Sequence, residues 1–260
     1  MKPRERALLS LKGLSTGDAL GETFFGGPEY VMPRIDSRTL PDGPCSYTDD
    51  TEMALSIVEE LSENGAIDPW SLARRMAKRA NWERGYGRGA RELLTEVRHG
   101  GSWRHLAPAL FNGRGSYGNG AAMRIAPLGA WFADDLDKVV SQAAASSKVT
   151  HSHEDGVAGG VAIAVAAAIA YQQFEAGKLD GSALISTVID KTPETLTKKA
   201  LVEAYKLPKG TKAEEAAEKL GTGGTALHSV PFCVWSAAQH LDDYEEAFWS
   251  TLRGLGDRDT

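Results

Sequence analysis

The sequence predicts an all-α fold, and three observations carry this prediction. Apolar residues recur at helical spacing along most of the chain. No segment alternates apolar and polar residues over the length of a strand, and alanine and leucine dominate the apolar positions. A length of 260 residues fits one domain, and a composition of 42% hydrophobic and 25% charged residues excludes general disorder.

The predicted helices follow one another with short connections. A strongly amphipathic helix is expected at 51–61, where the apolar residues 53, 54, 57, 58 and 61 share one face and Glu59 and Glu60 lie outside it. A second helix at 72–80 begins near Pro69 and turns its basic residues toward solvent. The further predicted helices are 90–98, 121–133, 136–146, 155–174, 182–190, 196–204, 212–220, 226–240 and 244–252.

Glycine is concentrated in four clusters, which are predicted to be connections that let backbone approach a ligand closely. The clusters are 13–26, 85–89, 113–120 and 221–224. No proline- or serine-rich boundary and no internal repeat divides the chain. We therefore expect one domain over residues 1–260, with the Lys- and Glu-rich stretch 191–219 as a solvated outer layer.

Charge and cysteine usage exclude several classes of protein. The net charge is -6, which argues against sequence-independent nucleic-acid binding because that needs a basic surface. Cys45 and Cys233 form no spacing pattern, so neither a disulfide framework nor a cysteine zinc site is expected. No signal peptide is evident, and the apolar run 157–171 is shorter than a membrane span of about 20 residues. A cytoplasmic protein without a membrane partner is expected.

The first candidate site is Thr48-Asp49-Asp50, at the start of the helix predicted at 51–61. Asp49 followed by Glu52 resembles a capping box, so a purely structural role is one interpretation. The other is metal binding, because one hydroxyl and two carboxylates are hard oxygen ligands suited to Mg²⁺, Mn²⁺ or Ca²⁺. In that case both aspartates are expected to be exposed.

The C-terminal residues Asp257, Asp259 and Thr260 repeat this combination of two carboxylates and a hydroxyl. A frayed polar tail is the alternative. Together with residues 48–50, they could hold two metal ions in a helical bundle. Asp18 lies in a stretch of small apolar residues, where an unpaired charge is costly, so a supporting role near the site is expected.

A glycine-rich loop that feeds into a helix is the candidate anion site, because free backbone N–H groups and the helix dipole both favour phosphate. It is not a Walker A loop, since no Gly-Lys-Ser/Thr follows, and a plain glycine turn is the alternative. Tyr117 could stack on a base or a sugar. The residues expected to contact a ligand here are Gly115, Ser116, Tyr117, Gly118, Asn119, Gly120 and Met123.

His151 is a further candidate for ligand contact, ahead of the helix predicted at 155–174. A packing role for His151, with Asp155 capping the helix, is the alternative. The spacing does not match the zinc-protease helix motif.

Taken in order, these residues resemble the ADP-ribosylglycohydrolase family, which includes the hydrolase that reactivates ADP-ribosylated dinitrogenase reductase and the animal ADP-ribosylarginine and ADP-ribosylserine hydrolases. The resemblance covers nearly the whole chain. Its motifs are Gly17-Asp18-Ala19-Leu20-Gly21, Tyr47-Thr48-Asp49-Asp50-Thr51, Gly85-Tyr86-Gly87, Gly115-Ser116-Tyr117-Gly118-Asn119-Gly120-Ala121-Ala122-Met123-Arg124, Thr150-His151 and Gly256-Asp257-Arg258-Asp259-Thr260.

The resemblance implies an orthogonal bundle of many helices with two Mg²⁺ (or Mn²⁺) ions between residues 48–50 and residues 257–260. It implies that Asp49 and Asp50 are catalytic, that the glycine loop holds the diphosphate of ADP-ribose, and that Tyr117 and His151 lie near the ligand. The expected reaction is hydrolysis of the ribosyl C1″ bond of an ADP-ribosylated protein side chain, or of a related ADP-ribosyl compound, which releases ADP-ribose.

Two departures from the family pattern affect this expectation. Phe25 stands where many relatives carry a glutamate, and Glu22 lies nearby but one helical turn off. The missing acid favours arginine-linked over serine-linked substrates. The sequence also ends at Thr260, where relatives continue with a small-residue helix, so a truncated chain or a weakly bound second metal is expected.

Two non-enzymatic functions remain open at this stage. One is an ADP-ribose-binding module that kept the phosphate loop without efficient chemistry. The other is a structural relative of the crystallin type, against which the two retained acidic groups count.

Overall fold

Residues 1–260 are described by a computed structural model that contains fourteen α-helices and no strand, which confirms the predicted all-α fold. Three short 3₁₀ segments lie at Glu22–Phe24, Trp82–Arg84 and Asn119–Ala121. The helices are α1 (Pro3–Gly21), α2 (Pro28–Asp36), α3 (Asp49–Asn64), α4 (Pro69–Arg79), α5 (Arg88–Arg98), α6 (Trp103–Gly113), α7 (Ala126–Trp131), α8 (Leu136–Lys148), α9 (Glu154–Glu175), α10 (Gly181–Lys191), α11 (Leu196–Tyr205), α12 (Ala213–Leu220), α13 (Ala226–Gln239) and α14 (Tyr244–Leu252).

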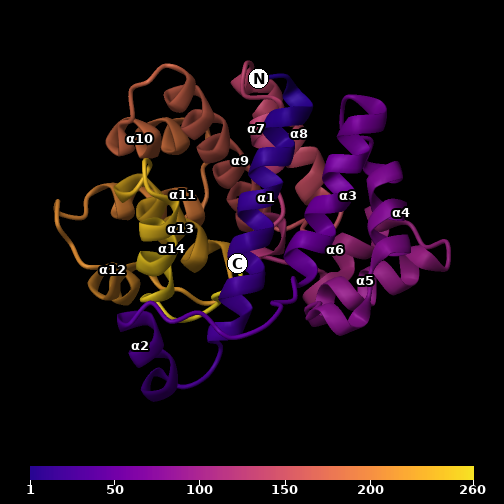
Figure 1. Ribbon diagram of the computed structural model, residues 1–260. Helices are drawn as coiled ribbons and strands as arrows, with labels where there is room; N and C mark the ends of the chain where they lie inside the picture. Colours follow the sequence, from indigo (N-terminus) through magenta and orange to yellow (C-terminus); the bar gives the residue numbers. More distant parts are fainter.

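Helix α1 runs through the middle of the molecule, with α3 to α6 on one side and α10 to α14 on the other (Figure 1). Helix α9 packs against α7, α8, α10 and α13, and its residues Ala158, Val161, Ala162 and Val165 have no exposed surface. By length and composition alone α9 could cross a membrane. Its apolar faces are instead used in packing against these neighbouring helices.

Three helices escaped the sequence prediction, namely α1, α2 and α6. Helix α1 contains a buried charged residue, Arg6. Its guanidinium donates to both carboxylate oxygens of Asp134, at 2.8 and 2.7 Å. The glycine cluster 13–26 is therefore not only a connection, since Gly13, Gly17 and Gly21 lie within α1. A Cβ on Gly21 would collide with the backbone of Arg258, so glycine here lets the end of the chain lie against α1.

The predicted helix 121–133 is also wrong. The segment contains the end of a 3₁₀ turn and then the short helix α7, which starts at Ala126 with Pro127 in its first turn. Proline is favoured in the first turn of a helix but cannot donate a hydrogen bond further in, so Pro127 favours a break before Ala126 and a new helix from there. The break leaves residues 119–125 as a turn that reaches into the site.

Candidate active site

Asp18 on α1 fixes the start of α3. Its carboxylate accepts hydrogen bonds from the Thr48 amide at 3.0 Å, the Thr51 amide at 3.1 Å and the Thr51 hydroxyl at 2.6 Å. The N-cap of α3 is Thr48, whose hydroxyl accepts from the Asp50 amide. The interpretation of Asp49 as the N-cap is therefore wrong. The carboxylates of Asp49 and Asp50 are not needed to cap the start of α3.

Asp49 and Asp50 are only 8% and 3% exposed, so the expectation of exposed side chains is wrong. Both nevertheless line a cavity of about 440 Å³, together with Asp257 and Asp259. Burial and, to a smaller extent, the nearby Asp259 carboxylate raise the pKa of Asp49 to about 7. The same causes hold the pKa of Asp50 well above its ordinary value. The cavity thus concentrates carboxylates that repel one another.

The C-terminal segment is held in place and is not a frayed tail. The Asn119 side-chain amide donates to the Asp257 carboxylate at 2.6 Å, and the Asp257 amide donates to the Thr222 carbonyl at 3.0 Å. Burial and the neighbouring Asp257 raise the pKa of Asp259 to about 7. Thr260 lines the same cavity. Residues 257–260 therefore meet residues 49–50 across the cavity, although more than 200 positions separate them in sequence.

The donor set of this cavity suits a hard divalent cation, because carboxylate oxygens predominate and no basic side chain pairs with them there. No group of three acidic, histidine or cysteine side chains converges closely enough to hold an ion in this structure. Thr48 contributes no surface to the cavity. The two-metal site therefore stays a prediction that the donor chemistry fits.

The glycine-rich loop forms another wall of the same cavity, through Ser116, Gly118, Asn119, Gly120 and Met123. A Cβ on Gly120 would lie 2.9 Å from the His151 ring, so only glycine fits beside this histidine. Gly115 has φ +71°, and a Cβ there would collide with Ser152 and His153. Gly115 does not line the cavity.

Arg124 holds this loop from inside the protein. Its guanidinium has no exposed surface and donates to the Gly120 carbonyl at 2.9 Å and to the Ser146 carbonyl at 3.1 Å. Burial without a carboxylate partner lowers the pKa of Arg124 to about 10. The sequence motif contained Arg124, but its function as an anchor was not predicted.

His151 is buried and lines the cavity, with its Nδ1 2.8 Å from the Thr150 hydroxyl. Burial, and then the charge of Arg124, lower the pKa of His151 to about 3, so the ring is neutral. Asp155 does not cap α9, because His153 is the N-cap residue. The Asp155 carboxylate accepts from the Thr197 amide at 2.8 Å and ties α9 to α11.

Two exposed aromatic residues flank the loop. Tyr117 is 46% exposed and packs edge-on against His153 with ring centroids 5.5 Å apart, outside the cavity wall. Phe111 is 47% exposed and does line the cavity. Phe111 and Asn112 both have positive φ, at 53° and 62°, which is a strained backbone for such residues. Phe111 was not predicted as a site residue, because a single aromatic residue ahead of a glycine-rich loop does not indicate which wall of a cavity it occupies.

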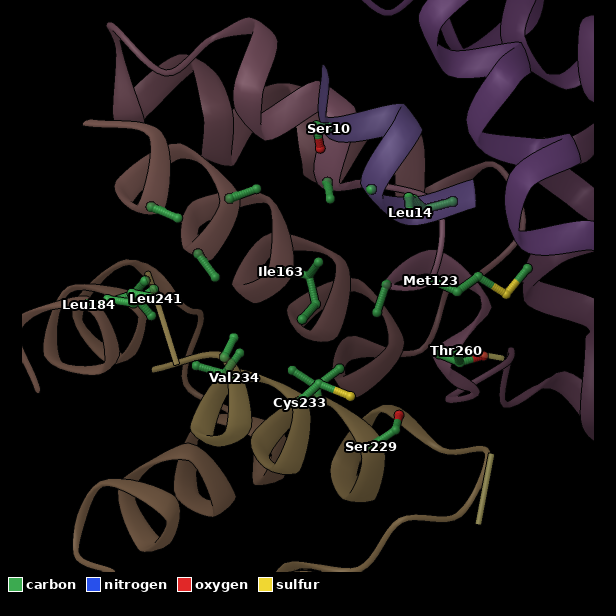
Figure 2. A pocket seen from close by; sticks show the side chains of 18 of the residues that line it. Ser10, Leu14, Met123, Ile163, Leu184, Ser229, Cys233, Val234, Leu241 and Thr260 are labelled. Carbon is green, nitrogen blue, oxygen red and sulfur yellow. The ribbon is translucent and has the colours of Figure 1, made fainter. Parts of the chain in front are cut away.

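A second cavity of about 420 Å³ lies between α1, α9 and α13 (Figure 2). It is lined mainly by apolar and small side chains, including Leu14, Ile163 and Val234. Burial raises the pKa of Cys233, which lines it, to about 12, so this thiol stays protonated at neutral pH. No charged side chain lines this cavity, in contrast to the one lined by carboxylates.

Comparisons with known proteins point the same way. A family model described as ADP-ribosylglycohydrolase matches residues 1–260. ADP-ribosylhydrolase ARH3 of Xenopus tropicalis is 28% identical over 91% of this chain and 75% of its own length. The Gallus gallus protein of the same name is 30% identical over 87% of this chain and 71% of its own.

A solved structure titled ADP-ribosylglycohydrolase-related protein complex has the same fold. Its TM-score is 0.72 at 23% identity, and the match covers 100% of this chain and 84% of that one. With the family match over its full length and the carboxylates gathered beside the glycine-rich loop, this chain belongs to the ADP-ribosylglycohydrolase family and is a hydrolase.

Proposed function

We propose that the protein hydrolyses the C1″ bond between ADP-ribose and a protein side chain, with Mg²⁺ or Mn²⁺ as its cofactor. One observation carries the proposal. The carboxylates of Asp49, Asp50, Asp257 and Asp259 line the same cavity as the glycine loop Gly118–Gly120. A glycosidic bond needs carboxylate chemistry at its anomeric carbon, and a diphosphate needs backbone N–H groups, so the two requirements meet in one place.

The cavity matches the three parts of ADP-ribose in order. Phe111 offers a half-exposed ring for the adenine base, the glycine loop offers its backbone to the diphosphate, and the carboxylates lie beyond for the distal ribose. Arg124 holds the Gly120 carbonyl inward, which leaves the opposite side of that peptide to the ligand. His151 is neutral and can exchange hydrogen bonds without adding charge.

The residues that would hold the metal ions are those that line the cavity, namely Asp49, Asp50, Asp257, Asp259 and Thr260. Bound there, a divalent cation lowers the pKa of water and stabilises negative charge. Asp49 and Asp50 would orient the attacking water and accept its proton, because burial raises the pKa of Asp49 to about 7 and that of Asp50 well above its ordinary value. Asn119 keeps the Asp257 carboxylate in place through its hydrogen bond.

We further propose that arginine-linked ADP-ribose is the preferred substrate. Phe25 is half-exposed, lies under the Arg258 guanidinium at 5.6 Å and contributes nothing to the cavity. No acid at position 25 can therefore protonate a leaving hydroxyl. A guanidine leaving group is a better base and needs that contact less. Burial, and then the nearby charges of Asp18 and Asp257, raise the pKa of Glu22, so it is the acid that could offset the loss.

The test is a side-by-side time course on arginine-linked and serine-linked peptides, with and without MgCl₂. Release of ADP-ribose from the arginine-linked peptide only with MgCl₂ supports the proposal. Faster release from the serine-linked peptide contradicts the preference, and Glu22→Gln then shows whether Glu22 is the acid. Binding of ADP-ribose without any release supports the binding-module alternative, and neither binding nor release supports the structural one.

A further inference from the structure

Arg88 differs from every other charged residue in the active-site cavity. The cavity is lined by four aspartates and only two arginines, Arg88 and Arg124. Arg124 is buried and its guanidinium already serves two carbonyl groups. Arg88 is exposed and forms no hydrogen bond or ion pair within the protein. It is therefore the one cation of the cavity that is free to meet an anion.

The position of Arg88 does not serve the stability of the fold. It is the first residue of α5, whose first turn contains no acidic residue. A positive charge at a helix N-terminus is unfavourable, because it lies at the positive end of the helix dipole. The neighbouring Gly87 has no atom within 4 Å of where a Cβ would lie, so the backbone beside Arg88 is left open. Arg88 lines both the active-site cavity and an open hollow along α5.

Residues 85–89 run along one wall of the cavity from its carboxylate end to its aromatic end. A Cβ on Gly85 would lie 3.6 Å from the Asp49 carboxylate, and a Cβ on Gly89 would lie 3.0 Å from the Phe111 ring. Arg88 comes between these two glycines. The part of ADP-ribose that joins its nucleoside to its distal ribose is the diphosphate.

We propose that Arg88 binds the diphosphate of ADP-ribose, from a wall of the cavity other than the glycine loop. The inference rests on the proposed function, because it takes ADP-ribose as the ligand. The backbone N–H groups of the glycine loop carry no net charge, so Arg88 would supply the positive charge that this loop lacks. An arginine fork matches phosphate oxygens in geometry as well as in charge. Arg88 thus determines selectivity for a phosphate-bearing ribosyl ligand.

The experiment is calorimetric titration of ADP-ribose at saturating MgCl₂ into the wild type and the variants Arg88→Ala, Arg88→Lys and Arg91→Ala. Arg91 lies one turn further along α5 and its guanidinium donates to the Trp82 carbonyl, so it is the matched control. We expect about tenfold weaker binding for Arg88→Ala, partial recovery for Arg88→Lys, and wild-type binding for Arg91→Ala. Raising NaCl should weaken binding to the wild type more than to Arg88→Ala.

Equal affinity of the wild type and Arg88→Ala would overturn the inference. So would an Arg88→Lys variant no better than Arg88→Ala, because charge would then not be what matters. Unchanged ADP-ribose affinity combined with a raised KM for a modified peptide would assign Arg88 to an acidic group of the target protein instead. A wild type that does not bind ADP-ribose contradicts the proposed function itself, which distinguishes the two failures.

Discussion

The side-chain amide of Asn119 donates to the carboxylate of Asp257 at 2.6 Å, across 138 positions of sequence. This hydrogen bond joins the glycine-rich loop to the C-terminal acidic residues. A second link is the Asn119 amide, which donates to the Gly224 carbonyl at 3.2 Å. The wall that would bind phosphate and the wall that would bind metal are therefore fixed relative to each other.

Replacing Asn119 by alanine should uncouple these two walls. Loss of a hydrogen bond to a charged group costs about 1.5–3 kcal/mol, so we expect kcat/KM to fall by about tenfold or more. The measurement is ADP-ribose release under subsaturating substrate. Circular dichroism should show an unchanged helical signal, because Asn119 lies in a turn. Wild-type activity in this variant would show that the hydrogen bond between Asn119 and Asp257 is not needed for the reaction.

Asp49→Asn and Asp50→Asn should each reduce turnover by about 100-fold or more, since a carboxylate that orients water and binds a cation is lost. Asparagine is chosen because both side chains are buried and a truncation would leave a hole. Glu59→Gln on the same helix is the control, because Glu59 pairs with Arg75 and Arg79 outside the cavity. Turnover equal to that of the control would show that these aspartates are not catalytic.

Without metal, the protein should lose stability as the pH rises. The pKa values of Asp49 and Asp259 are about 7 in the fold but near 4 in the unfolded chain. Between about pH 4 and pH 7 the folded state binds more protons, so the free energy of unfolding falls with pH and the loss is complete above pH 7.

The readout for this pH dependence is the melting temperature in EDTA of the wild type and of Asp49→Asn. At pH 8 the variant should melt about 5 °C higher, and the difference should vanish near pH 4. Added MgCl₂ at pH 8 should stabilise the wild type more than the variant. A difference in melting temperature that does not depend on pH would mean that the fold does not raise the pKa of Asp49.

In the glycine loop, a side chain at position 118 should disturb ligand binding less than one at position 120. A Cβ on Gly118 meets atoms no closer than 3.3 Å, whereas one on Gly120 meets the buried His151 ring at 2.9 Å. We expect Gly118→Ala to bind ADP-ribose nearly as the wild type does, and Gly118→Val and Gly120→Ala to weaken it by about tenfold. Thermal shift against ADP-ribose concentration measures this. Full binding by Gly118→Val would mean that the diphosphate lies elsewhere.

How much of this could be predicted from sequence differs between the helices. Helix α3 shows a regular apolar face, and its prediction at 51–61 falls within Asp49–Asn64. Helix α1 shows no such face, because it is held by the buried Arg6, whose partner Asp134 lies 128 residues away, and by close approach of other segments to its glycines. Long-range contacts of this kind leave no periodic signal.

The candidate site divides in the same way. Residue type and motif order were enough to nominate Asp49, Asp50 and Asp257, which the structure brings to one cavity. Burial was not predictable from the motif, so the raised pKa of Asp49 was missed. Phe111 and Arg88 became visible only through the fold, because their relevance depends on which wall of the cavity they occupy. A single arginine or phenylalanine in a sequence does not by itself predict a contact with a ligand.

The neutral ring of His151 has a consequence for any future pH–rate profile of this enzyme. A change in activity between pH 5 and 8 is usually assigned to a histidine, since the ordinary pKa of histidine lies in that interval. Here the pKa of His151 is about 3, whereas that of Asp49 is about 7. An inflection near neutrality would therefore not report His151, although histidine is the residue to which such an inflection is usually assigned.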